Sequence, residues 1–377
     1  MENILKIGII GCGGIANQKH MPALASLSHL GKMVAFCDIV DERAIKAAAE
    51  FGDADAKVYS DYKELLKDES IDVVHVLTPN LYHAPITVDA LEAGKHVMCE
   101  KPMAINSTEA KRMLDAAKKS GKKLTIGYQN RFNEESLVVH KACSSGDLGD
   151  IYMAKAHAVR RKAVPTWGVF TDKKLQGGGA LIDIGTHALD LTLWCMDNYK
   201  PKSVTGSVYY KLKDNTEGNL FGPWDPATID VEDSAFAFIK MENGASIFLE
   251  CSWALNTTEV KEAKTSLFGV EGGAEMKAGP DGKTELVFNT AKYGKLVDFK
   301  PNTRASVAYF NGAEGSPGVL EAKQWLECII HDTEPLVKAE QAYVVTQILE
   351  AVYRSAETGQ TVELATNSDH NTLLYSK

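Results

Sequence analysis

The first third of the chain alternates short apolar runs with helical stretches, and this alternation constrains the fold more than any other feature. Helices are expected at residues 41–51, 82–93 and 107–120. Between them lie five strand-like runs rich in valine and isoleucine: ILKIGII, VAFCD, DVVHVLT, HVMCE and KLTIGYQ. Strands that are apolar throughout and separated by helices are typical of a parallel sheet covered on both faces. The sequence therefore predicts a doubly wound α/β domain here.

A glycine-rich turn follows the first of these runs. The segment KIGIIGCGGIA places Gly11, Gly13 and Ala16 between a strand and a helix, at the spacing of a dinucleotide-binding turn. Gly11 allows the tight turn, Gly13 allows a pyrophosphate to approach the backbone, and Ala16 allows the helix to pack closely on the strand. Amide groups at the helix N-terminus would receive the phosphates. We expect Gly14 and Ile15 of the same turn to contribute to this Rossmann-type site.

Asp38 ends the second run and indicates which dinucleotide binds. A carboxylate there can accept hydrogen bonds from both ribose hydroxyls and would repel a 2′-phosphate. This favours NAD as the cofactor over NADP. Arg43 keeps NADP as the less favoured alternative, because a guanidinium turned toward the ribose would tolerate the extra phosphate.

The pattern changes after about residue 130, where β-rich runs replace the alternation. The stretch AFAFIKMENGASIFLECSWAL holds two such runs around Asn243 and Gly244, a dipeptide that strongly predicts a tight hairpin. The runs TSLFGVEGGAEM and TELVFNTA continue the series, whereas residues 214–231 are expected to form a loop. We therefore predict a Rossmann domain at 1–128 and an α+β domain with a mostly antiparallel sheet at 129–377.

Composition and charge limit the class of protein and of partner. A chain of 377 residues suits two domains, and its net charge of −9 offers no basic footprint for nucleic acid or an anionic membrane. We expect neither a membrane-spanning segment nor a signal peptide. The seven cysteines are scattered without a C-x-x-C pair, which favours reduced thiols in a cytoplasmic protein over disulfides or a zinc site. The expected partner is a small molecule, and no metal is expected.

Two further segments carry groups suited to chemistry. CEKPM places Lys101 at the end of the run HVMCE, where a doubly wound sheet opens its ligand crevice, and Pro102 restricts Lys101 to extended geometry. GGGALIDIGTHALDLTLW places Asp183 and His187 four residues apart, so that both can lie on one helix face. The glycines before them would leave room for a large group to approach the backbone.

The glycine turn, EKP and GGGALIDIGTHALDL, in this order, resemble the Gfo/Idh/MocA family of sugar oxidoreductases. The resemblance covers essentially the whole chain, including the ending EAVYRSAETGQTVEL. It implies a Rossmann domain followed by an α+β domain whose open-faced, mostly antiparallel sheet commonly serves in oligomer contacts. It also implies an NAD-binding site with the nicotinamide between the domains, and a homo-oligomer, either dimer or tetramer.

The resemblance also assigns roles to particular positions. The implied catalytic residues are Lys101, Asp183 and His187. The implied cofactor-binding residues, beyond the glycine turn and Asp38, are Thr78, Pro79, Asn80, His83, Glu100, Lys101 and Gln129. The implied substrate-binding residues are Arg161 and Trp167 of RRKAVPTWG together with the catalytic three. Lys162 and Ala163 depart from the Arg-Gly that is commoner in the family at those positions.

These roles match the oxidation of a secondary alcohol, which moves a hydride to nicotinamide and a proton to a base. His187 is the candidate base because imidazole titrates near working pH. Lys101 would stabilise the developing alkoxide and help relay the proton. Asp183 would accept a hydrogen bond from a substrate hydroxyl.

The longer match, AVPTWGVFTDKKLQGGGALIDIGTHALDL with FGPWDP and VEDSAFAF, resembles a subgroup that oxidises sugar rings. We expect a sugar or glycoside as substrate, oxidised at C3 of a glucoside to a 3-keto product, with Trp167 or Trp224 available to stack on it. Three alternatives remain: an inositol or cyclitol dehydrogenase, a glycosidase that retains NAD and acts by oxidation and elimination, and a non-catalytic sugar or nucleotide sensor. The complete set of Lys101, Asp183 and His187 argues against a sensor.

Overall fold

The computed structural model describes residues 4–279, 284–302 and 316–364 of the chain. By their contacts the residues form two compact units. The first unit comprises Met1–Leu137, Trp167–Gly178 and Asn302–Thr346, and the second comprises Val138–Thr166, Gly179–Pro301 and Gln347–Lys377.

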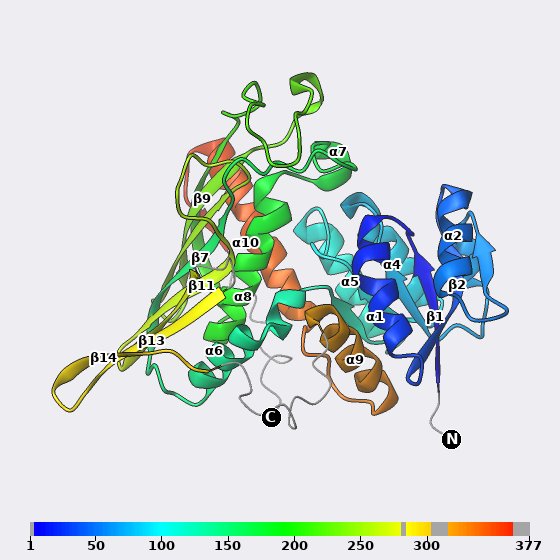
Figure 1. Ribbon diagram of the computed structural model, residues 1–377, viewed down its shortest axis with the longest axis horizontal. Helices are drawn as coiled ribbons and strands as arrows, with labels where there is room; N and C mark the ends of the chain where they lie inside the picture. Colours follow the sequence, from blue (N-terminus) through cyan, green and yellow to red (C-terminus); the bar gives the residue numbers. More distant parts are fainter. Residues whose placement is uncertain (1–3, 280–283, 303–315, 365–377) are drawn as a thin grey trace. The chain divides into compact units, whose positions relative to one another are not determined.

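The first unit is built on a parallel sheet, which has six strands within the described residues (Figure 1). The strand order is β3-β2-β1-β4-β5-β6, so the winding reverses between β1 and β4. At such a reversal the loops after the two strands part, which opens a ligand crevice at the carboxyl edge of the sheet. The strands are β1 (Leu5–Ile10), β2 (Gly31–Cys37), β3 (Lys57–Tyr59), β4 (Val73–Val76), β5 (His96–Cys99) and β6 (Leu124–Ile126).

Helices cover both faces of this sheet, as the apolar strands predict. Every residue of β4 and β5 but His96 is buried. The expected helices at 41–51 and 107–120 are confirmed as α2 and α5, and the expected helix at 82–93 is confirmed as α4. The helical segments are η1 (Ala16–His20), α1 (Met21–Ser26), α2 (Asp41–Phe51), α3 (Tyr62–Leu66), η2 (Asn80–Tyr82), α4 (His83–Glu92), α5 (Ser107–Ser120), η3 (Gln129–Phe132), α7 (Lys173–Gln176) and α9 (Pro317–Ile330).

The second unit is built on a larger sheet, of nine strands within the described residues, in the order β14-β13-β12-β11-β7-β10-β9-β8-β15. Neighbouring strands are antiparallel except β7 and β10, so the predicted, mostly antiparallel sheet is confirmed. The hairpin between β9 and β10 turns at Gly244, whose φ of +90° suits glycine. The strands are β7 (Ile151–Val159), β8 (Pro201–Tyr209), β9 (Ser234–Met241), β10 (Ser246–Ser252), β11 (Lys261–Gly269), β12 (Gly272–Ala278), β13 (Thr284–Lys292), β14 (Lys295–Phe299) and β15 (Val362–Glu363).

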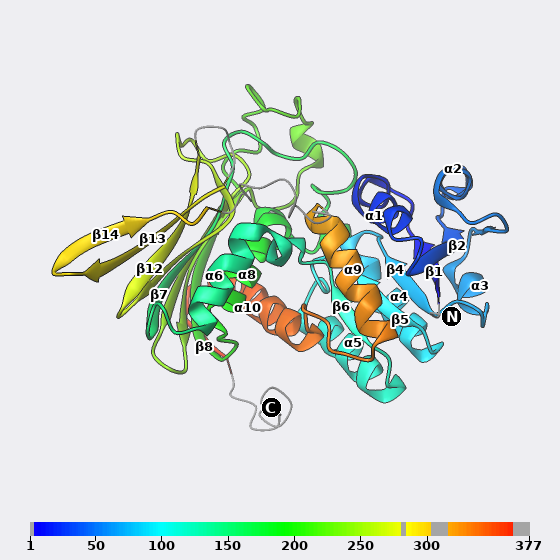
Figure 2. The ribbon, with the colours of Figure 1, turned by 60° about the horizontal axis from the view of Figure 1, so that its bottom comes forward.

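Helices pack on one face of this second sheet, as Figure 2 shows. The buried helix α8 lies against β7 and β11, and α10 packs so closely on β8 that a Cβ at Gly206 would come within 2.8 Å of Val352. No helix of the described residues covers the other face. The helical segments are α6 (Glu134–Ser144), η4 (Leu181–Gly185), α8 (Thr186–Met196), η5 (Pro226–Thr228) and α10 (Ala339–Thr358). Among the described helices none has the length and apolarity needed to cross a membrane.

Candidate functional site

The glycine turn after β1 has the shape that a dinucleotide requires. Gly11 has a φ of +94°, and a Cβ there would lie 2.6 Å from the carbonyl oxygen of Leu77, so only glycine fits at this position. A Cβ on Gly13 or Gly14 would meet no other described atom within 4 Å. The backbone on this side is therefore open to a close approach, and helical structure begins directly after it, with its amide groups at the turn. These residues fit the pyrophosphate of NAD.

Asp38 lies directly beside this turn. Its Oδ2 atom accepts a hydrogen bond from the backbone amide of Cys12 at 2.8 Å, and its Oδ1 atom accepts one from Val40 at 2.9 Å. Arg43 lies at 4.0 Å from Oδ1 and is largely exposed. The buried carboxylate is thus fixed by the backbone, and each oxygen keeps a second lone pair for a ribose hydroxyl.

The loops after β4 and β5 are joined by His83. Its Nδ1 lies 2.7 Å from the carbonyl oxygen of Pro102, and its Nε2 lies 2.9 Å from that of Thr78. Burial lowers the pKa of His83, so the neutral ring donates to one of these oxygens at a time. Because the ring is fully buried, His83 holds the loops rather than facing a ligand. The buried hydroxyl of Thr78 has no partner among the described residues, whereas Asn80 donates to the carbonyl oxygen of Gln176.

Glu100 directly follows β5 and has a fully engaged carboxylate. Its Oε1 atom accepts hydrogen bonds from Lys19 at 2.7 Å and from His20 at 2.8 Å, while Oε2 accepts one from the backbone amide of Lys101 at 2.9 Å. Burial opposes the charge, but Lys19 and His20 outweigh it and hold the pKa of Glu100 well below its usual range. The Lys101–Pro102 peptide bond is cis, and the Lys101 side chain is partly exposed. The turn, Asp38, Thr78 and Glu100 therefore share the carboxyl edge of one sheet.

The second unit presents Asp183 and His187 on one buried helical segment. Within residues 181–190 these two are the only partly exposed side chains, so the expected common face is present. The segment starts as a π-helix, η4, and continues as α8. Gly179 precedes it because a Cβ there would lie 2.1 Å from the carbonyl oxygen of Glu232. This glycine serves chain packing, which differs from the expected role of leaving room for substrate.

Three residues that hold this segment were not singled out from the sequence. The indole of Trp253 donates from Nε1 to Oδ2 of Asp183 at 2.9 Å. Glu232 accepts hydrogen bonds from the backbone amides of Gly179 at 2.8 Å and Leu181 at 2.9 Å, and from the hydroxyl of Tyr353 at 2.9 Å. Burial raises the pKa of Glu232. Their positions in CSWAL, VED and EAVYR carry no local signal of this role, because each contact joins distant parts of the chain.

The RRKAVPTWG segment places its two arginines differently. Arg160 is mostly buried and forms a two-pronged ion pair with Glu262, with Nε at 2.7 Å from Oε2. Burial opposes its charge, but Glu262 and, to a smaller extent, Asp183 raise its pKa. Arg161, predicted from the resemblance, is exposed and forms no ion pair with a described side chain. Arg160 is therefore the arginine whose charge acts on Asp183.

The two candidate stacking residues also differ. Trp167 is 51% exposed and its ring meets that of Phe170 edge-on at 5.8 Å. Trp224 is buried, and its indole donates to the carbonyl oxygen of Lys213 at 2.7 Å. Trp224 is therefore a packing residue of the 214–231 loop.

Gln129 lies on η3, and neighbouring Arg131 is fully buried against the segment before α10.

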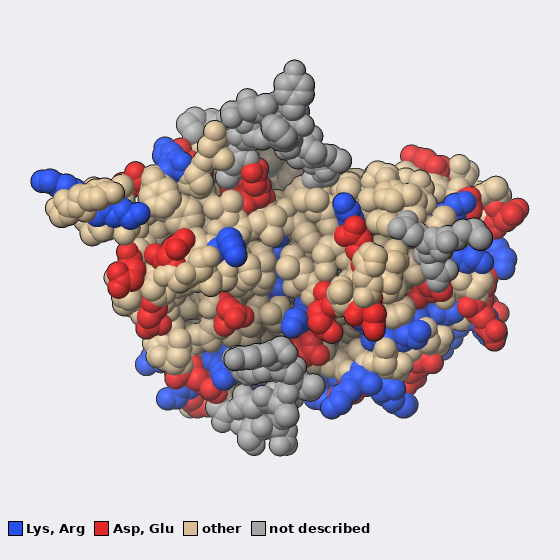
Figure 3. Space-filling model, turned by 90° about the horizontal axis from the view of Figure 1, so that it is seen from below, with Lys and Arg blue, Asp and Glu red and all other residues tan. Residues whose placement is uncertain are grey.

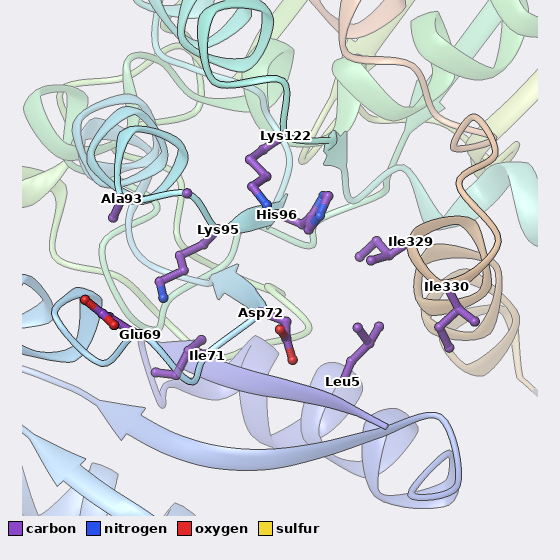
Figure 4. Close-up of a pocket in the computed structure, with 11 residues that line it drawn as sticks. Leu5, Glu69, Ile71, Asp72, Ala93, Lys95, His96, Lys122, Ile329 and Ile330 are labelled. Atoms are coloured by element: carbon purple, nitrogen blue, oxygen red, sulfur yellow. The ribbon is translucent and has the colours of Figure 1, made fainter. Parts of the chain in front are cut away.

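A pocket of about 440 Å³ lies at the opposite edge of the first sheet (Figure 4). It is lined by residues at the amino ends of strands, such as Leu5, Asp72 and His96, and by Ile329 and Ile330 of α9. It therefore does not belong to the edge that carries Gly11 and Glu100. On the face of the molecule in Figure 3, acidic and basic groups of the described residues are interspersed, as on a surface without a single-sign patch.

Comparisons with known proteins match both parts of the chain to one family. A family model described as an oxidoreductase family with an NAD-binding Rossmann fold matches residues 5–128, and one described as its C-terminal alpha/beta domain matches residues 140–364. D-glucoside 3-dehydrogenase from Escherichia coli (strain K12) is 37% identical over 96% of this chain and 97% of its own. Inositol 2-dehydrogenase from Salmonella typhimurium is 29% identical over 78% of this chain and 80% of its own. The crystal structure of aldose-aldose oxidoreductase from Caulobacter crescentus has a TM-score of 0.77 at 25% identity, covering 96% of this chain and 100% of that one.

Proposed function

Because the chain belongs to the Gfo/Idh/MocA family of oxidoreductases, we propose that it oxidises a secondary hydroxyl of a sugar or glycoside, at C3 of a glucoside, to give a 3-keto product. Its first domain is an NAD-binding Rossmann domain, and NAD is its cofactor. The full-length similarity to a D-glucoside 3-dehydrogenase supports this substrate class. The observation that carries the proposal is the pair Asp183 and His187, the only partly exposed side chains among the otherwise buried residues 181–190.

We assign the cofactor to the carboxyl edge of the first sheet. The turn at Gly11, Gly13, Gly14 and Ile15 would receive the pyrophosphate, and Asp38 would receive the adenosine ribose. The hydroxyl of Thr78, which has no partner among the described residues, would face the rest of the dinucleotide together with Pro79, Asn80 and Gln129. Glu100 would hold the Lys101 backbone beside them. Asp38 supports NAD over NADP by charge. His83 would act by holding the loops at this edge.

Bound NAD supplies the hydride acceptor, and the protein's own residues handle the proton and the charge. His187 takes the proton of the reacting hydroxyl, because a neutral imidazole is a competent base near neutral pH. The Lys101 ammonium stabilises the negative charge that develops on the oxygen. Asp183, held by Trp253, accepts a hydrogen bond from a neighbouring hydroxyl of the substrate and so orients the sugar ring. Trp167 and Arg161, both exposed, are proposed to contact more distant parts of the substrate.

A substrate panel tests this function. Purified protein is incubated with NAD and with monosaccharides, inositols and glucosides, while NADH absorbance and product mass are recorded. A keto-glucoside lighter than its substrate by two hydrogens is the expected product. Keto-inositol formed in preference would favour the cyclitol alternative, which the similarity to an inositol 2-dehydrogenase supports. Release of free aglycone without net NADH would contradict the proposal and favour a glycosidase that retains NAD.

We also propose that the uncovered face of the second sheet mediates self-association into a dimer or tetramer. This face carries Phe238 and Phe248, whose ring centroids are 5.0 Å apart, and the pair Tyr209 and Phe236 at 6.0 Å. Phe248 is 45% exposed in the single chain. Exposed aromatic clusters of this kind mark protein interfaces. All seven cysteines are free thiols, which supports the proposal of a cytoplasmic location.

A further inference from the structure

The ammonium group of Lys19 is buried between two carboxylates in the first unit. Its Nζ atom lies 2.7 Å from Oε1 of Glu100 and 2.8 Å from Oε2 of Glu321, which is on α9. The three side chains are at most 9% exposed. Buried charges persist only where they are paired, so a change of charge at one of these groups is felt by the other two.

The Glu100 carboxylate transmits the position of Lys19 to Lys101. One oxygen contacts Lys19, and the other accepts the hydrogen bond from the Lys101 backbone amide. The carboxylate also lies against Gly127, where a Cβ would come within 3.0 Å of it. With so little free space, a movement of Lys19 toward Glu321 would shift both the carboxylate and the Lys101 peptide group.

Two neighbouring imidazoles do not replace Lys19 as the positive charge. His20 Nδ1 lies 3.3 Å from Nδ1 of His75. Burial, and then Lys19, lowers the pKa of His20, and burial lowers the pKa of His75 still further. Both rings are therefore neutral near pH 7. His20 donates through Nε2 to Glu100 and accepts at Nδ1 from His75, which leaves Lys19 to balance both carboxylates.

Of the two carboxyl groups, Glu321 is the one that takes up a proton near neutral pH. Burial raises its pKa to about 7, an effect that Lys19 reduces and Glu100 increases. The titratable groups on the elements packed against α9 are Lys19 and the neutral His20 on η1 and Arg131 on η3; α1 has none. Arg131 donates hydrogen bonds to α10 and to the segment before it. Lys19 is thus the cation in contact with Glu321.

We propose that Glu321 is a positioning residue for the NAD-binding edge, and that it acts through Lys19 on Glu100 and on the backbone of Lys101. The inference rests on the roles proposed above for Glu100 and Lys101. An ionised Glu321 draws Lys19 away from Glu100 and adds a negative charge near an edge that binds an anionic dinucleotide. When Glu321 is protonated, the Lys19 ammonium pairs with Glu100 alone. Affinity for NADH therefore falls as the pH rises through neutrality.

Glu321→Gln tests this, with Glu327→Gln as the matched control. Glutamine keeps the size of the side chain and an oxygen for Lys19 but does not ionise. Glu327 lies on the same helix with an exposed side chain, 41% accessible. NADH affinity is measured by fluorescence titration at about pH 6 and about pH 8.5, on either side of the Glu321 pKa. The unaltered protein and the control should bind NADH about three- to tenfold more weakly at the higher pH, and E321Q equally at both.

An unchanged pH dependence in E321Q would overturn the inference. If E321Q fails to fold, the unaltered protein provides the test. Because the proposed affinity falls as the pH rises, NADH binding at about pH 7 must be accompanied by proton uptake. Calorimetry in buffers of different ionisation enthalpy measures this uptake. Binding without proton uptake would also overturn it. These titrations use NADH alone, so an error in the proposed sugar substrate would leave their result intact.

Discussion

The indole nitrogen of Trp253 lies 2.9 Å from Oδ2 of Asp183, although the two residues are 70 positions apart. Trp253 is 1% exposed, whereas Asp183 is partly exposed, so the indole fixes one carboxylate oxygen from the protein side. This contact converts a flexible acidic side chain into an acceptor with a defined direction, which is what orienting a sugar hydroxyl requires.

Trp253→Phe should lower kcat/KM for the sugar by about tenfold to a hundredfold, because a hydrogen bond to a charged group is lost. NADH affinity should stay unchanged, since Trp253 lies outside the unit that carries the glycine turn. The matched control is Trp325→Phe, which alters an equally buried indole whose nitrogen has no partner among the described residues. Equal losses in the two variants would refute a specific role for the Trp253 contact.

His187→Ala should reduce kcat by about a hundredfold or more, because the proton acceptor is removed. Binding of NADH, measured by fluorescence, should persist. Activity that survives in this variant would assign the base to another residue. A parallel loss of NADH binding would indicate misfolding instead, and thermal unfolding of the variant checks that case.

Asp38→Ala should lower the ratio of kcat/KM for NAD to that for NADP by at least about tenfold, because the carboxylate that repels a 2′-phosphate is gone. Arg43, 4.0 Å from Oδ1 in the unaltered protein, would then be released to contact the added phosphate. Asp53→Ala is the control, since Asp53 is an exposed acid paired with Lys32. A preference for NADP in the unaltered protein would contradict the role given to Asp38.

The fold should lose stability on mild acidification, partly through His96. Burial, followed by Lys122 and Lys123, lowers the pKa of His96 from 6.5 to about 4. Its Nδ1 accepts a hydrogen bond from the Lys123 amide at 3.1 Å, which a proton would abolish. The unfolded chain binds this proton more readily. The contribution is therefore complete above about pH 6.5 and is lost as the pH falls toward about 4.

His96→Asn keeps an acceptor for Lys123 without titrating in this range. Between about pH 7 and about pH 4.5 the free energy of unfolding should fall in both proteins. The decrease in H96N should be smaller by about 1–2 kcal/mol, after allowance for the partial exposure of the His96 ring. Denaturant titrations at the two pH values measure this. His29→Asn, at an exposed position, should leave the pH dependence as it is. Identical slopes for H96N and the unaltered protein would contradict the prediction.

Phe248→Glu should convert the proposed oligomer to monomers, because a charge would be buried in the aromatic cluster of the uncovered sheet face. Light scattering at micromolar concentration measures the mass. Tyr293→Glu, at a 97% exposed position, is the control and should leave the assembly intact. A monomeric unaltered protein would end the self-association proposal outright.

Local patterns in the sequence were sufficient to predict the kind of sheet in each unit. Continuous apolar runs predict strands that are buried on both faces, and Asn243-Gly244 predicts a hairpin. Both predictions work because the spacing of apolar residues and the geometry of a turn depend on residues that are neighbours in the sequence. The short strand β3, mostly exposed, escaped notice because it lacks an apolar run. The glycine turn could be read in the same way, since the φ of Gly11 is a local requirement.

The sequence by itself thus determined the two kinds of sheet, the turn offered to the dinucleotide and the helix face shared by Asp183 and His187. Only the tertiary structure decided which groups hold them. Trp253, Glu232 and Lys19 contact partners at least 51 residues away, and no local sequence pattern predicts such contacts. The choice between Arg160 and Arg161 also depended on the tertiary structure. Adjacent side chains at a strand end point to opposite faces, and the packing of the sheet decides which of the two is buried.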